Sequence, residues 1–244
     1  MPRRVVPRSG PSRLPALDAD LARRWRWQAT VEVLADLGVL DPGVDADSPD
    51  VRAVVGEVGP ARGRPAPESA RFLAAVSAGS TDDVKARLSA AAQRTSREAQ
   101  VEQAANQAVN RLALSLSLYD EVPVLYKSLG VAQPTWRTRE IRGLGLDPTA
   151  EADKAWYRDA TSAELSERAR SAGLEHVAGA GEQLPEAVRE LITTQARWAG
   201  ARRVRDALIR ELYPEQCNQP QLQALTGLGQ AQVWQIINPD FRQR

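Results

Sequence analysis

The sequence predicts an all-α protein. Ala, Leu, Arg and Glu are abundant and β-branched residues are sparse, which favours helix over strand. Apolar residues make up 43% of the 244-residue chain, enough for a buried core. Several segments also carry apolar residues at spacings of three and four, which marks one face of a helix. We therefore expect a multi-helix protein.

Charge is distributed locally rather than globally. The formal net charge is +1 at pH 7, so a chain-wide basic field is absent. Residues 197–210 nevertheless hold five Arg and one Asp, whereas residues 36–50 are acidic and contain no Lys or Arg. Any surface for nucleic acid must therefore come from such local asymmetry.

Several classes of protein fit the sequence poorly. A single Cys217 and a single His176 cannot supply an internal disulfide or a Cys/His zinc set. We find no phosphate-binding or dinucleotide-binding glycine motif and no nucleophile motif, so we expect no enzyme, cofactor or metal. No run of 18 apolar residues or signal-peptide pattern is present, so we expect a soluble cytoplasmic protein without a membrane partner.

The first half predicts an arm, a helix, a loop and a long helix. Residues 1–17 carry four Pro and four Arg and are expected to be a flexible basic arm, or a disordered tail with no role. A helix is expected over 18–37, ended by a glycine, with loop over 38–67. Within that loop, "VRAVVGEVG" fits a short strand or a helix turn equally well. Thr81 is expected to cap a helix over 81–119 that breaks near 93–98.

The second half predicts two further helices before the C-terminal segment. "TSAELSERARSAG" has Thr161 and Ser162 before Glu164, a capping pattern, and ends at Gly173. The Gly-rich stretch "AGAGEQ" reads as a link. A long helix is then expected from Pro185 to Tyr213, bent or interrupted near Gly200.

The C-terminal segment has the layout of a helix-turn-helix. "PQLQALTG" starts at Pro220 and predicts a short helix ended by Gly227, and "QAQVWQII" predicts a second helix. The segment from Arg197 onward resembles a helix-turn-helix family common in actinobacteria. The resemblance rests on these positions: Leu222, Leu225, Gly227, Leu228, Val233 and Trp234. Two features depart from the family: Gly229 replaces a small polar residue such as Ser, and the connection "PEQCNQ" is unusual. Either departure is compatible with a retained fold that has lost its DNA contact.

The resemblance implies a role for each position. The small core would consist of Leu222, Leu225, Leu228, Val233 and Ile237. The base-reading face of the second helix would consist of Gln230, Ala231, Gln232 and Gln235, and Gln is suited to adenine because its amide can bond N6 and N7 together. The phosphate contacts would come from Arg202, Arg203, Arg205, Arg242 and Arg244. The alternative is a helical hairpin whose Gln residues are simply good exposed helix formers.

An internal repeat predicts a second unit of this kind. Arg-x-Ala-Leu-x-x-x-Leu-Tyr occurs at 111–119 and at 205–213. After loops of three and six residues, Pro-x-Leu-x-x-x-x-Gly-x-x-Gln follows at 123–133 and at 220–230. The upstream third helix would begin at Gln133 or Pro134, with Glu140 interrupting its apolar face. Its base-reading residues would be Gln133, Thr135, Arg137 and Thr138, with Arg139 and Arg142 on phosphates. The alternative is coincidence between two helical hairpins.

These features predict a tandem DNA-binding protein. The expected organisation is a flexible arm (1–17), an N-terminal helical region (18–96), a first helix-turn-helix unit (97–146), a connector (147–183) and a C-terminal unit (184–244). Arm residues Arg3, Arg4 and Arg8 would add phosphate contacts. The expected function is a bacterial transcriptional regulator, including plasmid or phage forms, that binds double-stranded DNA, with a homodimer or another protein partner left open. The alternative is a helical protein-interaction module built on degenerate helix-turn-helix units.

Overall fold

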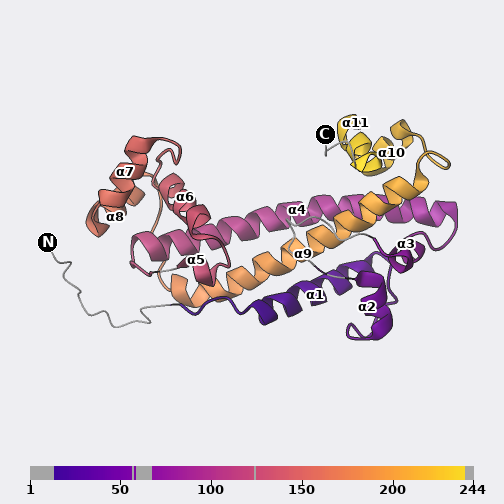
Figure 1. Ribbon diagram of the computed structural model, residues 1–244, viewed down its shortest axis with the longest axis horizontal. Helices are drawn as coiled ribbons and strands as arrows, with labels where there is room; N and C mark the ends of the chain where they lie inside the picture. Colours follow the sequence, from indigo (N-terminus) through magenta and orange to yellow (C-terminus); the bar gives the residue numbers. More distant parts are fainter. Residues whose placement is uncertain (1–13, 57, 59–67, 124, 240–244) are drawn as a thin grey trace. The chain divides into compact units, whose positions relative to one another are not determined.

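The computed structural model confirms the all-α class. It describes residues 14–56, 58, 68–123 and 125–239, and in these ranges all regular structure is helical (Figure 1). The eleven helices are α1 (Ala19–Asp36), α2 (Pro49–Val55), α3 (Ala70–Val76), α4 (Thr81–Leu118), α5 (Leu125–Ser128), α6 (Gln133–Gly143), α7 (Glu151–Asp159), α8 (Ser162–Ser171), α9 (Ala180–Leu212), α10 (Gln219–Thr226) and α11 (Gln230–Ile237). Among the described residues, none of these helices combines the length and apolarity that a membrane crossing requires.

The described chain forms two compact units that do not follow chain order. Unit 1 combines residues 14–19 with Ala105–Leu191, and unit 2 combines Asp20–Ala104 with the chain from Ile192 onward. Helices α4 and α9 each contribute one part to each unit, because a unit boundary falls inside each of them. Each unit therefore brings together segments from distant parts of the sequence.

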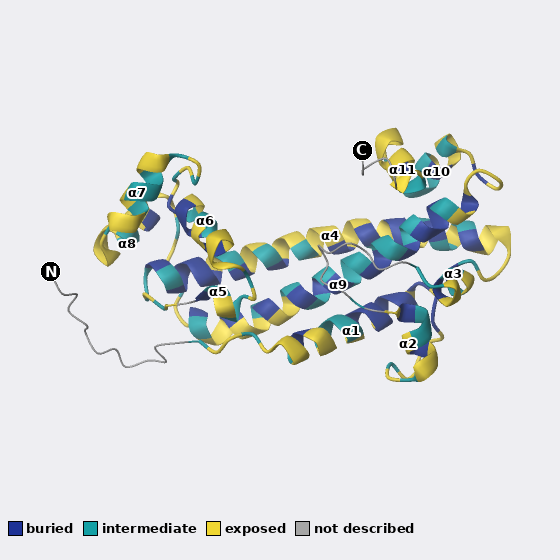
Figure 2. Cartoon of the chain, viewed as in Figure 1, coloured by how far each residue is buried: buried dark blue, intermediate teal, exposed yellow. Residues whose placement is uncertain are grey.

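Unit 2 has one continuous apolar core. Helix α1 lies along α9, and its buried residues, including Val33 and Leu34, concentrate in its second half (Figures 1 and 2). Gly200 of α9 permits this close approach, because a Cβ atom there would lie 2.6 Å from Cγ1 of Val33. The same core contains Phe72 of α3 and reaches Leu222 of α10 and Val233 of α11. The C-terminal helix pair is thus anchored on the core of unit 2.

The first five residues of the segment that fitted strand or helix turn are helical. The Ser48 hydroxyl accepts a hydrogen bond from Val51 N–H and begins α2, which buries Val51 and Val55. Ser69 caps α3 in the same way through Phe72 N–H. Part of the expected loop over 38–67 is therefore α2, and residues 57 and 59–67 lie outside the described residues.

Helix α4 runs without the break expected near 93–98. The buried face of α4 continues through that stretch, because Ala91, Thr95 and Glu98 all face the interior and are buried. The Thr95 hydroxyl donates a hydrogen bond to the Ala91 carbonyl at 2.7 Å, so this buried polar group has a partner within the helix. The cap is Ser80 rather than Thr81, since Ser80 exchanges hydrogen bonds with Asp83.

Helix α9 begins earlier than expected and is not interrupted. The Gly-rich stretch forms its first turns from Ala180, and Pro185 lies inside the helix at the cost of one backbone hydrogen bond. The helix also continues through Gly200 without the expected interruption. The glycine there serves the close contact with α1 instead.

Unit 1 packs α5 to α8 around the end of α4. Ser166 of α8 donates to the Leu118 carbonyl at 2.6 Å, and Arg168 donates to the Leu144 carbonyl at 3.0 Å. The capping pattern predicted for α8 is confirmed, because Thr161 and Glu164 form a reciprocal capping box. The end of the expected basic arm contacts this unit: Leu17 N–H donates to the Lys127 carbonyl of α5 at 3.1 Å.

Candidate nucleic-acid interface

The C-terminal helix pair forms as the sequence predicts. Asn218 caps α10 in a capping box with Gln221, and Gly227 ends α10 in the left-handed conformation with φ 68°. Helix α11 then begins at Gln230. Gly229 has no side chain to cap this helix, but the Gln232 side chain accepts its N–H at 3.1 Å. The short helix, glycine turn and second helix are therefore all present.

The core positions expected in this pair face inward. Leu222 and Val233 are fully buried, and their half-buried neighbours are Leu225, Leu228 and Ile237. Ser89 of α4 donates a hydrogen bond to the Leu225 carbonyl at 3.3 Å, which fixes the pair on unit 2. Cys217, expected in a polar loop, is also buried in this core.

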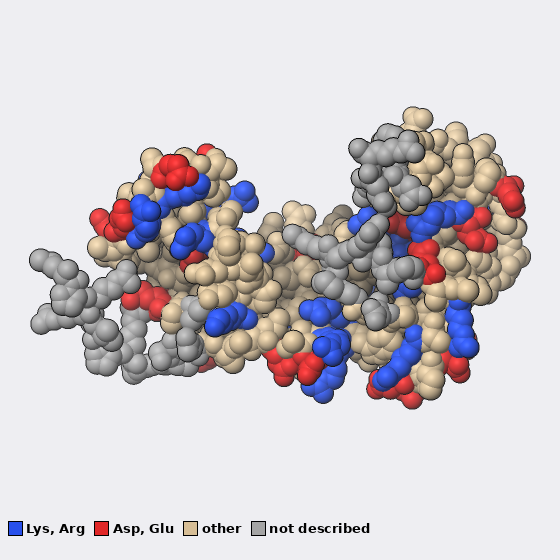
Figure 3. Space-filling view, viewed as in Figure 1, with Lys and Arg blue, Asp and Glu red and all other residues tan. Residues whose placement is uncertain are grey.

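The outward face of α11 is exposed but carries no charge. All four expected base readers are exposed, and their neighbour Trp234 is 38% exposed. The 24 residues from Gln216 to Pro239 contain no Asp, Glu, Lys or Arg. This face offers amide groups for base edges and no charged side chain for phosphates. Figure 3 shows the molecular surface with charged side chains coloured.

The central helix pair has the same order of elements. Helix α5 is followed by Gly130 with φ 64°, and α6 begins at Gln133, as the repeat predicts. Trp136 and Ile141 are buried on the inner face of α6, whereas Gln133 and Arg137 are exposed. The outer face of α6 is thus available in the way that the C-terminal face is.

Burial repeats between the two segments position by position. Ala113 and Leu118 of α4 lie in the core of unit 1. The corresponding residues of the second repeat, Ala207 and Leu212 of α9, lie in the core of unit 2. The remaining matched pairs of buried residues are Leu114 with Leu208, Ser115 with Ile209, Leu125 with Leu222, and Trp136 with Val233. A matched inner face and a matched glycine turn show that the sequence repeat corresponds to repeated local structure.

The outer face of α6 is basic. Arg137 and Arg142 are exposed together with Thr135, and Lys127 of α5 is exposed nearby in sequence. The one acidic residue of α6, Glu140, lies on the inner face and is only 7% exposed. Basic side chains accordingly gather over the α6–α8 segment in Figure 3, with acidic ones beside them. The two repeats therefore differ in charge while sharing their layout.

Two expected contacts of α6 are partly engaged within unit 1. Thr138 is half-buried and donates its hydroxyl to the Pro134 carbonyl at 3.0 Å. Arg139 is also half-buried, and its Nη1 donates to Asn110 Oδ1 of α4 at 3.0 Å. The exposed groups that remain on α6 are Gln133 and Arg137, on the side that carries Trp136 and Glu140, and Thr135 and Arg142, roughly on the opposite side of the helix.

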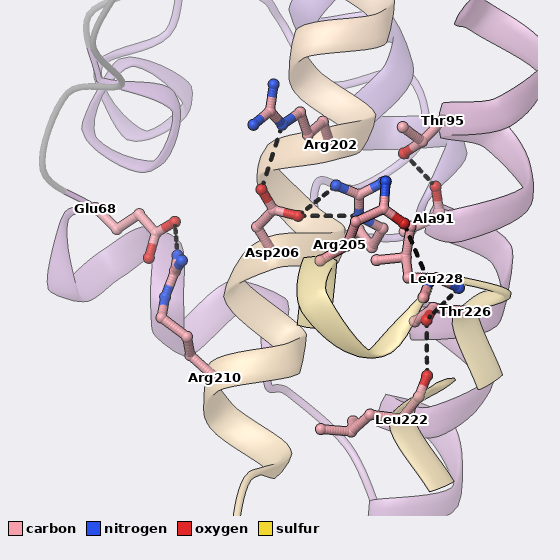
Figure 4. Close-up of polar contacts among 12 residues, drawn as sticks. Glu68, Ala91, Thr95, Arg202, Arg205, Asp206, Arg210, Leu222, Thr226 and Leu228 are labelled. Atoms are coloured by element: carbon pink, nitrogen blue, oxygen red, sulfur yellow. Dashed lines mark hydrogen bonds and ion pairs between the residues drawn. The ribbon is translucent and has the colours of Figure 1, made fainter. Parts of the chain in front are cut away.

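Three arginines of α9, Arg203, Arg205 and Arg210, are engaged by contacts within the protein. Asp206 lies between Arg202 and Arg205 in Figure 4, and the side chain of Arg205 is only 11% exposed. Arg203, which we expected to be exposed, is half-buried and donates to the Val55 carbonyl at 2.6 Å. The same figure shows Arg210 paired with Glu68 at 2.5 Å. Clustered Arg in the sequence here reflects packing of a long helix, since the stems are buried and the heads are paired.

Other expected phosphate contacts fall outside the described residues. These are Arg3, Arg4 and Arg8 of the arm and Arg242 and Arg244 at the end of the chain. His176, expected on the surface or in the core, is exposed and lies 3.1 Å from Asp120 Oδ1. Trp25 and Trp27 are half-buried, and Trp27 donates to the Ala46 carbonyl at 3.1 Å.

Comparison with known proteins adds no assignment. No protein-family model, no curated protein and no solved structure matches the chain.

Proposed function

We propose that the chain is a cytoplasmic DNA-binding protein with a role in transcription regulation, and that α6 enters the major groove. The observation that carries this proposal is the repeated helix–glycine–helix layout whose third helix, in unit 1, has an exposed basic face. Positive charge supplies the sequence-independent attraction to phosphates. The N-terminal residues of a recognition helix contact base edges, which places Gln133, Thr135 and Arg137 in that role.

The proposal assigns separate roles to the two exposed arginines of α6. Arg137 lies in the N-terminal half, so it reads a base, for which guanine is the natural target through O6 and N7. Arg142 follows five residues later, about 140° further around the helix, and contacts phosphate. Arg203 and Arg205 are left out of the interface because their intramolecular contacts occupy them.

The test uses the purified chain and a library of duplex DNA. Selection should enrich a site, and Arg137→Ala should relax preference at one base pair of it, at a cost of about 1–3 kcal/mol. Arg142→Ala should weaken binding to every duplex and make the salt slope shallower by about one unit. The matched control is Arg189→Ala, an exposed arginine on the unit 1 part of α9, which should change neither quantity. The proposal fails if selection enriches no site and binding to mixed duplexes shows no salt dependence.

A specific observation favours a second function for the other repeat. The exposed face of α11 has no charge and displays Trp234, the kind of aromatic side chain that anchors protein interfaces. We propose that this face contacts protein, either a second copy of the chain or another partner, while α6 binds DNA. Trp234→Ala should then abolish self-association or partner binding and leave the DNA salt slope intact. Loss of DNA affinity in that variant would instead place α11 on DNA.

A further inference from the structure

A cavity of about 210 Å³ lies against α6 within unit 1. Helix α6 contributes Trp136, Arg137 and Glu140 to its lining. The other lining residues that matter here are Ser117 at the end of α4, Tyr126 of α5 and Tyr157 of α7. The cavity therefore joins the helix that we assign to DNA with three neighbouring elements of the same unit.

Glu140 places a carboxylate in this cavity with neutral partners. One carboxylate oxygen, Oε1, accepts a hydrogen bond from the Ser117 hydroxyl, and Oε2 accepts one from the Tyr157 hydroxyl at 2.6 Å. Burial, reinforced by the hydrogen bond to Glu140, raises the pKa of Tyr157 above its ordinary range, so its hydroxyl keeps its proton and remains a donor. Among the described residues, no Lys or Arg forms an ion pair with Glu140.

A buried carboxylate of this kind favours a positive partner. Taking an ionised group out of water is costly unless an opposite charge accompanies it, and two hydroxyl groups bring no opposite charge. Arg137 lines the cavity and its charge acts on Tyr157, but its side chain is exposed, and no ion pair between it and Glu140 is found among the described residues. A cation that enters the cavity would provide a direct opposite charge for Glu140.

The remaining lining selects the kind of cation. Trp136 is buried and Tyr126 and Tyr157 are half-buried, so three aromatic side chains surround the space next to the carboxylate. Aromatic rings attract cations through the negative charge of their faces, and they favour organic ammonium groups whose alkyl substituents can also be buried. We propose that this cavity binds a small organic ammonium ion, with its positive charge against Glu140 and its alkyl groups against the aromatic side chains.

The size of the cavity limits the ligand. A cavity of about 210 Å³ is many times the volume that one water molecule requires, so it has room for a small organic ion. Choline is small and carries the required charge, so it is a suitable probe. Larger polyamines or dyes would extend beyond the cavity into solvent.

The ligand site bears on the proposed DNA contact, and this part of the inference rests on the proposed function. Gln133 and Arg137 belong both to the cavity lining and to the face that we assign to DNA. A bound cation repels the Arg137 guanidinium away from the cavity and toward solvent, where the phosphates and bases would lie. Choline should therefore raise DNA affinity, acting as an effector.

The first experiment measures ligand binding to the full chain without DNA. Calorimetric titration compares choline with 3,3-dimethylbutan-1-ol, which has the same shape but carbon in place of the charged nitrogen. We expect saturable binding of choline and at least tenfold weaker binding of the neutral alcohol. Glu140→Gln should weaken choline binding at least tenfold, whereas the exposed Glu164→Gln of α8 should leave it unchanged. Equal binding of the two compounds, no saturable binding of choline, or unchanged affinity in Glu140→Gln would overturn the proposal.

A second variant guards against a folding defect in Glu140→Gln. Tyr126→Leu removes a half-buried ring without touching the carboxylate, and it should weaken choline binding at least threefold while circular dichroism shows the helical content retained. A Tyr126→Leu chain that is folded and binds choline as tightly as the unmodified chain would remove the aromatic part of the proposal.

DNA binding is then measured with and without choline, which separates the two proposals. Binding of choline by a chain that binds no DNA would support the ligand site and refute the proposed function. Binding of DNA by a chain that shows no choline binding in calorimetry would support the proposed function and refute the ligand site. If both bind, a rise in DNA affinity that Glu140→Gln abolishes supports the coupling, and an unchanged DNA affinity overturns it.

Discussion

Arg203 donates a hydrogen bond from Nη1 to the carbonyl oxygen of Val55 at 2.6 Å. The same guanidinium lies over the ring of the buried Phe72, with Cζ 3.8 Å from the ring centre. This one side chain therefore joins α9 to the end of α2 and to α3. Burial lowers the pKa of Arg203 from its ordinary value, while the charge of Glu68 acts against that shift. The contact explains a basic residue in the interior of unit 2 without any reference to DNA.

Replacing this arginine should therefore affect stability. Arg203→Met keeps an apolar stem but removes the hydrogen bond to a charged group and the contact with the ring, and we expect a loss of about 1.5–3 kcal/mol in the free energy of unfolding. Arg202→Met should cost less than about 1 kcal/mol, because the Arg202 side chain is 44% exposed in its ion pair with Asp206 and its Cζ lies further from a ring, 5.4 Å from the centre of Trp198. Denaturant unfolding followed by circular dichroism compares the two. Equal stability of both variants would mean that the interior contact contributes nothing.

The arginines of α9 show where sequence reasoning reaches its limit. The period of apolar residues gives the inner face of a helix, and it predicted the burial of Leu222 and Val233. It does not show which charged side chains at the edge of that face turn inward. Arg203 turns inward because α2 and α3 supply a carbonyl oxygen and a ring, and both come from sequence about 130 to 150 residues away.

Gly200 should not tolerate a side chain. In Gly200→Ala the new Cβ would lie 2.6 Å from Val33 Cγ1, closer than real contacts allow, so α1 and α9 must separate. Overpacking of this kind costs about 1–3 kcal/mol, of which the better helix propensity of Ala returns up to about 1 kcal/mol. We expect a net loss of stability and faster hydrogen exchange in the second half of α1.

Two comparisons isolate the steric cause. Gly181→Ala, in the same helix but in unit 1, would place its Cβ at an ordinary 3.8 Å from Leu116 Cδ2, and it should be neutral or stabilising. Val33→Ala removes the clashing methyl groups, so the Gly200→Ala and Val33→Ala double variant should be more stable than the sum of the single effects predicts. Simple additivity would show that the close approach is not the reason for Gly200.

The N-terminus of α8 should show a carboxyl group of lowered pKa. The Thr161 N–H and hydroxyl both donate to Glu164 at 2.7 Å, and they lower the pKa of Glu164 below its ordinary value of 4.5. A lowered folded-state pKa stabilises the fold above the unfolded value of 4.5, and this contribution is lost as the pH falls through the lowered value. NMR titration should find Glu164 below 4.5, and in Thr161→Ala it should return toward 4.5. A Glu164 that titrates at its ordinary value in the unmodified chain would contradict the capping box.

The sequence predicted the helix pairs of the candidate interface, but it did not predict the cavity beside α6. The repeat of Arg, Ala, Leu and Tyr followed by Pro, Leu, Gly and Gln located both glycine turns and the start of α6 at Gln133. Glu140 was visible only as an interruption of the apolar face. Its partner Tyr157 belongs to α7, which is outside the repeat, so no local pattern indicated that the two side chains meet. The cavity depends on that meeting and required the three-dimensional structure.

The turn between α10 and α11 should respond in opposite ways to two substitutions of its glycines. Gly227 has φ 68°, and a Cβ there would meet open space, so Gly227→Ala has only the backbone cost of a left-handed residue, about 1 kcal/mol. Gly227→Asn should cost less, because Asn tolerates this conformation.

Gly229 has φ −69° and begins α11 without a side-chain cap, and a Cβ there would have only an ordinary contact with Gln232. Gly229→Ser adds a side-chain cap and should stabilise the pair by a few tenths of a kcal/mol. Denaturant unfolding monitored at Trp234 should rank the variants as Gly229→Ser, unmodified chain, Gly227→Asn and Gly227→Ala, in order of falling stability. If Gly227→Ala were as stable as the unmodified chain, the left-handed turn would not define the helix pair.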